Sequence, residues 1–199
     1  MVMDKQQPLL RRLAAAAGGV AAALALAACG AAAPGAVQGK TSLAAYRNNF
    51  VTFKYPETWK PFVFSQSGGL HYDPFLFLST QPAHNPCRTS GTSTICGWPV
   101  GHLSANGVLV LWENRGYPGW TLRSAPGQST KVGGRPAKRA VEKPGRCGAI
   151  GANETIAIAI ARPLQDNWTA VTACIHDADL AAANGQIDAL LASTRFLRP

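Results

Sequence analysis

The segment Glu154–Ala161 reads ETIAIAIA, in which isoleucine and alanine alternate without interruption. Strict alternation is typical of a β-strand, because successive side chains of a strand point to opposite faces of the sheet. After a turn at residues 163–167, the segment Asn167–Ile175 (NWTAVTACI) alternates again. Two such runs on either side of a short turn predict neighbouring strands, so this part of the chain must form a sheet.

Further strands are predicted along the chain from alternation or from short apolar runs bounded by turn residues. They cover residues 50–55, 61–64, 74–80, 107–113, 129–132, 135–141 and 194–197. Gly133-Gly134 supplies the positive φ values that a tight hairpin turn requires between two of them. Residues 81–99 contain few apolar side chains and are predicted to form a long polar loop.

One helix is predicted over Asp177–Ser193. Either Asp177 or Asp179 can cap its start. Its apolar side chains recur with the helical period, at Leu180, Ala183, Ile187, Leu190 and Leu191. A second, short helix is predicted over Ser42–Tyr46. The sum is an α+β fold, an antiparallel β-sheet of about seven strands packed with a C-terminal helix.

The first residues look unlike the rest of the chain. Residues 1–12 (MVMDKQQPLLRR) carry three positive charges and one negative charge, and Leu13–Ala28 carries none. This apolar run is shorter than the ~20 residues of a membrane span and ends in small residues, as in a removable export signal. Arg11-Arg12 leaves a twin-arginine route open, although the flanking residues favour the general secretory route.

The end of this run resembles the bacterial lipobox. The residues are Leu26-Ala27-Ala28-Cys29-Gly30, and the resemblance implies cleavage between Ala28 and Cys29, with acyl chains attached to Cys29. Two or more chains anchor a protein stably in a membrane. Residues 30–40 (GAAAPGAVQGK) are rich in alanine and glycine and fit a flexible tether. The predicted organisation is a signal at 1–28, a lipidated tether at 29–40 and one globular domain at 41–199.

The other cysteines are even in number: Cys87, Cys96, Cys147 and Cys174. In an exported chain this indicates disulfides, with three possible pairings. We favour Cys87–Cys96, which would close a polar loop, and Cys147–Cys174, which would join neighbouring strands. Zinc on Cys87, Cys96, His84 and His102 is the alternative, but the eight residues between the two cysteines do not match a zinc-knuckle spacing.

Three segments occur in a distinctive order: FVTFKYPETW at residues 50–59, VGGRPAKRA at residues 132–140 and LLASTRFL at residues 190–197. In this order they resemble PsbP-like domains, including those of actinobacterial lipoproteins of the LpqN kind. The resemblance implies an α/β/α sandwich around an antiparallel sheet. It also implies a binding or assembly role without catalysis, and it transfers no catalytic residue.

A search for chemistry finds no nucleophile elbow, zinc-protease motif, phosphate loop or dinucleotide fingerprint. Most of the nine carboxylates after residue 28 lie beside predicted turns or caps, where a structural role suffices. The best pair for an enzyme is His71 with Asp73. No cofactor and no metal is predicted.

The tryptophans are divided by their predicted surroundings. Trp112 and Trp168 lie on strands and are predicted to be in the core. Trp98, Tyr117 and Trp120 lie in loops rich in glycine and proline and are the candidates for a ligand cleft.

The formal net charge is +9. It would attract anionic lipid heads or cell-wall polymers, whereas the scattered basic residues lack a nucleic-acid motif. We therefore expect a lipoprotein on the extracytoplasmic face of a bacterial cell membrane. It would act as a non-enzymatic binding or assembly factor for an envelope protein, lipid or glycan, and not for nucleic acid. The alternatives are an anchored hydrolase using His71 and Asp73, and a structural envelope component.

Overall fold

The two alternating segments form the centre of a seven-stranded antiparallel sheet in the computed structural model, which describes residues 41–64, 71–91, 93–163 and 166–197. Strand β10 (Glu154–Ala161) pairs with β11 (Asn167–His176) over its whole length, from Glu154 opposite Ile175 to Ala161 opposite Trp168. In spatial order the sheet contains β3 (Lys60–Phe62), β4 (Tyr72–Ser79), β7 (Gly107–Gly116), β11, β10, β9 (Arg135–Glu142) and β8 (Gln128–Val132).

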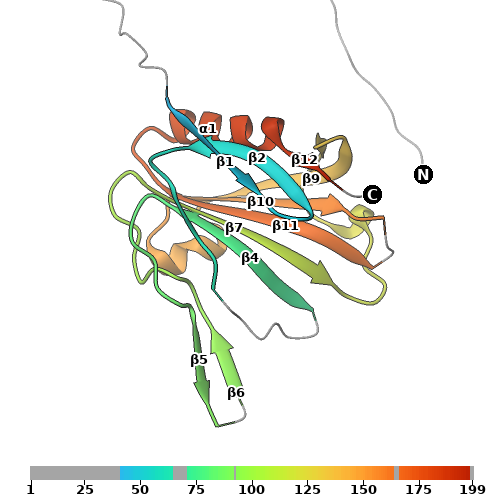
Figure 1. The fold of residues 1–199 in the computed structure, drawn as a ribbon, viewed down its shortest axis with the longest axis horizontal. Helices are drawn as coiled ribbons and strands as arrows, with labels where there is room; N and C mark the ends of the chain where they lie inside the picture. Colours follow the sequence, from blue (N-terminus) through green and yellow to red (C-terminus); the bar gives the residue numbers. More distant parts are fainter. Residues whose placement is uncertain (1–40, 65–70, 92, 164–165, 198–199) are drawn as a thin grey trace, which may run out of the picture. The chain divides into compact units, whose positions relative to one another are not determined.

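One face of this sheet is covered by a small second sheet and by the helix. The second sheet contains β1 (Leu43–Arg47), β2 (Val51–Pro56) and β12 (Arg195–Phe196). Helix α1 (Leu180–Ser193) packs mainly against β2, as Figure 1 shows. The isoleucines of β10 lie in the core between these layers, together with Phe53 and Trp112, whose rings stack with centroids 4.7 Å apart.

Helix α1 begins at Leu180, three residues later than predicted. The backbone N–H of Asp179 donates to Asp177 Oδ1, so the chain still turns there. Asp179 is the N-cap, and its Oδ1 accepts from the Ala182 N–H at 3.0 Å. The residues that the helical period placed on the apolar face are largely buried, including Ile187 and Leu190.

The predicted helix over Ser42–Tyr46 is wrong, because this segment is strand β1. Its side chains alternate between exposed and half-buried, and Tyr46 pairs with Phe53 of β2. The Tyr46 and Phe53 rings stack with centroids 5.2 Å apart. Cross-strand packing of this kind outweighs the helix propensity of a short alanine-containing segment.

The predicted polar loop at residues 81–99 contains a separate hairpin. Strands β5 (Cys87–Ser90) and β6 (Ser93–Cys96) pair with each other, with Cys87 opposite Cys96. A disulfide joins these two residues. The hairpin extends away from the main sheet (Figure 1) and pairs with no other described strand.

The second disulfide joins Cys147 to Cys174, which is the pairing that the sequence favoured. The sequence predicted that Cys147 lies on a bent continuation of a strand, and this is wrong. Cys147 lies in the 3-10 helix η2 (Gly145–Ile150), which follows a cis peptide bond at Lys143–Pro144. Both cysteines are completely buried. They belong to a second, smaller core on the sheet face opposite α1, with Leu109 and Val100 among its members.

The predicted hairpin around Gly133-Gly134 is confirmed, with β8 and β9 on either side of it and φ values of 57° and 81° at the two glycines. The predicted α+β class is also confirmed, since one α-helix packs with a seven-stranded sheet in the described ranges. The opposite sheet face carries η2 and connecting loops, so the sandwich implied by the family resemblance stays a prediction.

The described residues belong to one compact unit, Lys40–Pro199. The predicted signal at 1–28, the cleavage between Ala28 and Cys29, the lipidated Cys29 and the tether up to residue 40 lie outside the described residues. Within the described ranges, the chain contains no helix with the length and apolar character needed to cross a membrane. Two disulfides are typical of a protein that matures in an oxidising compartment.

Candidate functional site

A groove of about 320 Å³ lies on the sheet face opposite α1. Its floor contains Ala157 and Ala159 of β10 and Ala170 of β11. The alternation in β10 explains this placement. Its isoleucines point into the main core, so its alanines must point to the other face, where their small side chains leave space. This volume is at the lower end of the ~300–1,000 Å³ range of small-molecule sites.

Strand register places charged and aromatic side chains beside this floor. Glu113 of β7 is opposite Ala170, which is opposite Ala159. One step along the same face, Arg115 of β7 is opposite Trp168 of β11. Glu113, Arg115 and Trp168 all line the groove, so one end of it is polar and aromatic while the floor is apolar.

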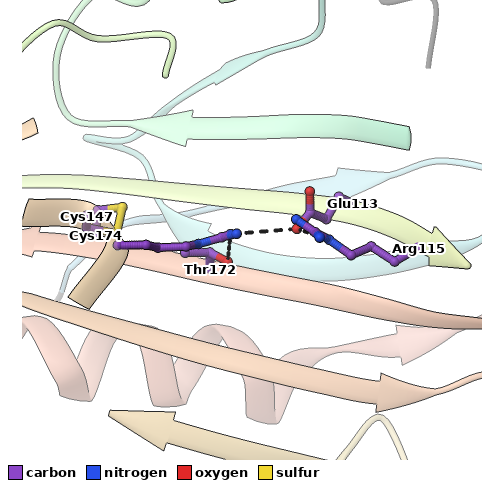
Figure 2. Close-up of polar contacts among 6 residues, drawn as sticks. Glu113, Arg115, Cys147, Thr172 and Cys174 are labelled. Atoms are coloured by element: carbon purple, nitrogen blue, oxygen red, sulfur yellow. Dashed lines mark hydrogen bonds and ion pairs between the residues drawn. A yellow bond between two sulfur atoms is a disulfide. The ribbon is translucent and has the colours of Figure 1, made fainter. Parts of the chain in front are cut away.

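Glu113 is completely buried and contacts two guanidinium groups. Arg115 Nε donates to Glu113 Oε1 at 2.8 Å, and Arg146 of η2 has a nitrogen 3.7 Å from the same oxygen. Figure 2 shows Arg115 and Glu113 side by side on β7. The arginine side chains are 30% and 42% exposed, respectively. They therefore lie between the buried carboxylate and solvent.

The second oxygen of this carboxylate, Glu113 Oε2, is buried without a hydrogen-bond partner among the described residues. Buried polar atoms in native proteins nearly always have a partner, and an unpaired one costs about 1–3 kcal/mol, more for a charged group. Glu113 Oε2 is thus an unpaired acceptor beneath the groove, behind the two arginines that separate this carboxylate from solvent.

Aromatic rings hold both arginines in place. Arg115 lies over the Tyr72 ring at 5.3 Å, and Arg146 lies over the Trp98 ring at 5.5 Å. Arg146 also donates to the Thr172 hydroxyl on β11 (Figure 2 labels Thr172 beside the disulfide). Burial, followed by the negative charge of Glu113, raises the pKa of Tyr72 above its usual 10.0, so this phenol stays protonated.

Trp168 forms an aromatic wall of the groove. The prediction that it is a core residue is therefore wrong. Trp168 is half-buried, and its ring stacks on Trp120 with centroids 4.2 Å apart and an interplanar angle of 13°. A ring held by another ring presents a rigid apolar face.

The three residues proposed from sequence for a ligand cleft lie in different surroundings. Trp98 packs against the second core and Arg146, and Trp120 packs against Trp168. Each therefore supports a residue that lines the groove. Tyr117 is 61% exposed, and its ring lies 5.4 Å from that of His71.

His71 and Asp73 have separate partners. His71 Nδ1 is 2.7 Å from the Gly116 carbonyl oxygen, and Asp73 accepts from Asn114 Nδ2 at 3.2 Å. Both residues line a small hollow of about 170 Å³ at the end of β4 and β7, and both are exposed. No hydrogen bond joins the two side chains in the described part of the chain, so the structure provides no acid–base pair there.

The cysteines of the zinc alternative, Cys87 and Cys96, are bonded to each other. The described residues contain no group of three or more histidine, cysteine, aspartate or glutamate side chains arranged to hold a metal ion.

Sequence reasoning missed Glu113, Arg115, Arg146 and the alanine floor. Two signals were available. The alternation of large and small residues in ETIAIAIA indicates a sheet face with free space, and Glu113 follows directly on the apolar run GVLVLW. A carboxylate at the end of such a run needs a buried partner. Arg146 was missed because the segment around Cys147 was predicted as a bent continuation of a strand, whereas it forms η2, which the disulfide and a hydrogen bond from the Cys147 N–H to Thr155 hold beside β10 and β11.

No protein-family model matches this sequence, and no curated protein matches it either.

Proposed function

We propose that this protein is an exported, lipid-anchored binding protein that holds a small ligand in the groove of its main sheet without catalysing a reaction. The observation that carries the binding proposal is the alanine-floored groove, which is lined by Trp168 and by the partly exposed side chains of Arg115 and Arg146. Anchoring rests on the lipobox resemblance at Cys29, and export is supported by the two disulfides. The resemblance to PsbP-like lipoprotein domains supports a role without catalysis.

Anchoring is tested by Cys29→Ala. In a bacterial host that processes lipoproteins, the wild-type chain should take up a labelled fatty acid and sediment with membranes. The variant should lose the label, because the four cysteines that the structure describes are all paired in disulfides. Acyl labelling of the variant would contradict the assignment of Cys29.

Binding in the groove is tested by filling it. Ala159→Leu adds apolar volume to the floor without removing a polar partner, so the fold should survive. Ala189→Leu is the matched control, because Ala189 is exposed on α1 at the other side of the sheet. The chain is purified from host membranes and analysed by native mass spectrometry. We expect a bound small molecule on the wild-type and Ala189→Leu chains and none on Ala159→Leu. Equal occupancy of all three would refute binding in the groove.

A further inference from the structure

We propose that the groove binds a neutral carbohydrate, with the sugar ring on Trp168 and a pair of hydroxyl groups at the arginines that cover Glu113. This inference rests on the proposed binding function and names the class of ligand. Three independent properties of the groove carry it: its charge balance, its arrangement of donors and acceptors, and its aromatic wall.

The charged side chains that line the groove cancel. The negatively charged residues are Glu113 and Glu142, and the positively charged residues are Arg115 and Arg146. A ligand with a net charge would meet groups of both signs at close range and gain from one what it loses to the other. A neutral ligand avoids this conflict, even though the whole chain has a formal net charge of +9.

Donors and acceptors lie side by side at the polar end. The exposed carboxylate of Glu142 lines the groove as an acceptor, whereas the guanidinium groups have only N–H donors to offer. The 3.7 Å separation between Arg146 and Glu113 Oε1 is too long for a direct hydrogen bond. A hydroxyl group both donates and accepts, so it can accept from the exposed guanidinium of Arg146 and donate to an exposed groove carboxylate such as that of Glu142. Two adjacent hydroxyls could do the same for Arg115 and Arg146 together.

The rest of the groove fits the apolar face of a sugar ring. Trp168 presents a flat face that Trp120 keeps in position from behind. Ala157, Ala159 and Ala170 provide a floor without bulky side chains, and the volume of about 320 Å³ suits a ligand of one or two sugar rings. The polar and apolar parts of the groove therefore match the two parts of a pyranose.

The test compares sugars of one ring size that differ in charge. Neutral glucose, mannose, galactose and N-acetylglucosamine, anionic glucuronate and cationic glucosamine are each offered at up to 10 mM to the intact chain. Octanoate serves as an apolar anion. Binding is followed by saturation-transfer NMR and calorimetry. We expect at least one neutral sugar to bind more tightly than glucuronate, glucosamine and octanoate.

Variants locate the binding of that sugar. Trp168→Ala and Arg146→Gln should each weaken it by about tenfold or more, since each removes a stacking face or a charged donor. Ala159→Leu should abolish it, and Ala189→Leu should leave it unchanged. Arg146 is 42% exposed, so Arg146→Gln should fold; thermal unfolding of each variant confirms this before binding is measured.

The outcomes separate the two proposals. If octanoate or a charged sugar binds best and Ala159→Leu blocks it, the groove is a binding site but the carbohydrate inference is wrong. If no neutral sugar binds, or Arg146→Gln and Trp168→Ala bind it as the wild type does, the inference is also wrong. Failure of the groove as a site is shown separately, by equal occupancy of wild type and Ala159→Leu in the mass-spectrometric test.

Discussion

The Cys147–Cys174 disulfide fastens η2 to β11 beside the groove, and its removal should lower both stability and binding. Arg146 precedes Cys147 in η2, and Thr172, which accepts from Arg146, lies two residues before Cys174. Figure 2 labels Thr172 and Cys174, which both belong to β11, and shows Cys147 of η2 bonded to Cys174. The perturbation is the double variant Cys147→Ala/Cys174→Ala.

The loss of stability follows from the length of the closed loop. For a sequence separation of 27, the chain-entropy model gives about 3.5 kcal/mol of unfolding free energy. With an unfolding entropy near 0.34 kcal/mol/K for the compact unit at Lys40–Pro199, this lowers the melting temperature by about 10 °C. Lost packing of the two buried sulfur atoms adds to this loss.

The other disulfide provides the control. For Cys87–Cys96, with a separation of 9, the same model gives about 2.6 kcal/mol. However, β5 and β6 pair only with each other among the described strands, and Cys96 is exposed. The hairpin can therefore open locally without unfolding the main sheet, so Cys87→Ala/Cys96→Ala should shift global unfolding much less.

Urea unfolding followed by tryptophan fluorescence, together with calorimetry, measures both variants in a Cys29→Ser background. Ligand binding is measured on each at a temperature where it is folded. We expect Cys147→Ala/Cys174→Ala to lose about 3.5 kcal/mol and to bind more weakly, because η2 no longer fixes Arg146. A loss below 1 kcal/mol, or an equal loss in the two double variants, would refute the reasoning.

Three further changes test the site and the fold. Glu113→Gln keeps the shape of the side chain but removes the countercharge of Arg115 and Arg146, and urea unfolding should show a loss of about 2–3 kcal/mol, moderated by the partial exposure of both arginines; an unchanged midpoint would contradict the role of the carboxylate. Asp179→Ala removes the N-cap acceptor of α1 and should cost about 1 kcal/mol by the same measurement; Asp188→Asn, which removes only an exposed ion pair with Arg139 from the same helix, should cost less. The folded-state pKa of Tyr72 is raised, so its stabilising contribution is present below pH 10 and is lost as pH rises through the folded-state pKa; in urea unfolding, the stability of wild type relative to Tyr72→Phe should fall above pH 10, and a constant difference would contradict the raised pKa.

Local pattern predicted those elements whose side chains alternate or recur with a clear period. Strands β10 and β11, the hairpin around Gly133-Gly134 and helix α1 all have such a pattern, because one of their faces is buried and the other is not. The pattern failed at residues 42–46 and at η2. A few residues rich in alanine fit a helix or an edge strand equally well, and only pairing with β2 decides between them.

The amino-acid pattern alone predicts a sheet around two alternating strands, a helix after it, and an even number of cysteines after residue 40. These features depend on residues close together in the chain. Tertiary packing places the alanine face of β10 on the side of the sheet away from α1, and it brings Glu113, Arg146 and Trp168 together there from three separate elements. Their approach depends on strand register and on the Cys147–Cys174 disulfide, which join segments 27 or more residues apart in sequence. A site of this kind exists only once the whole sheet has formed.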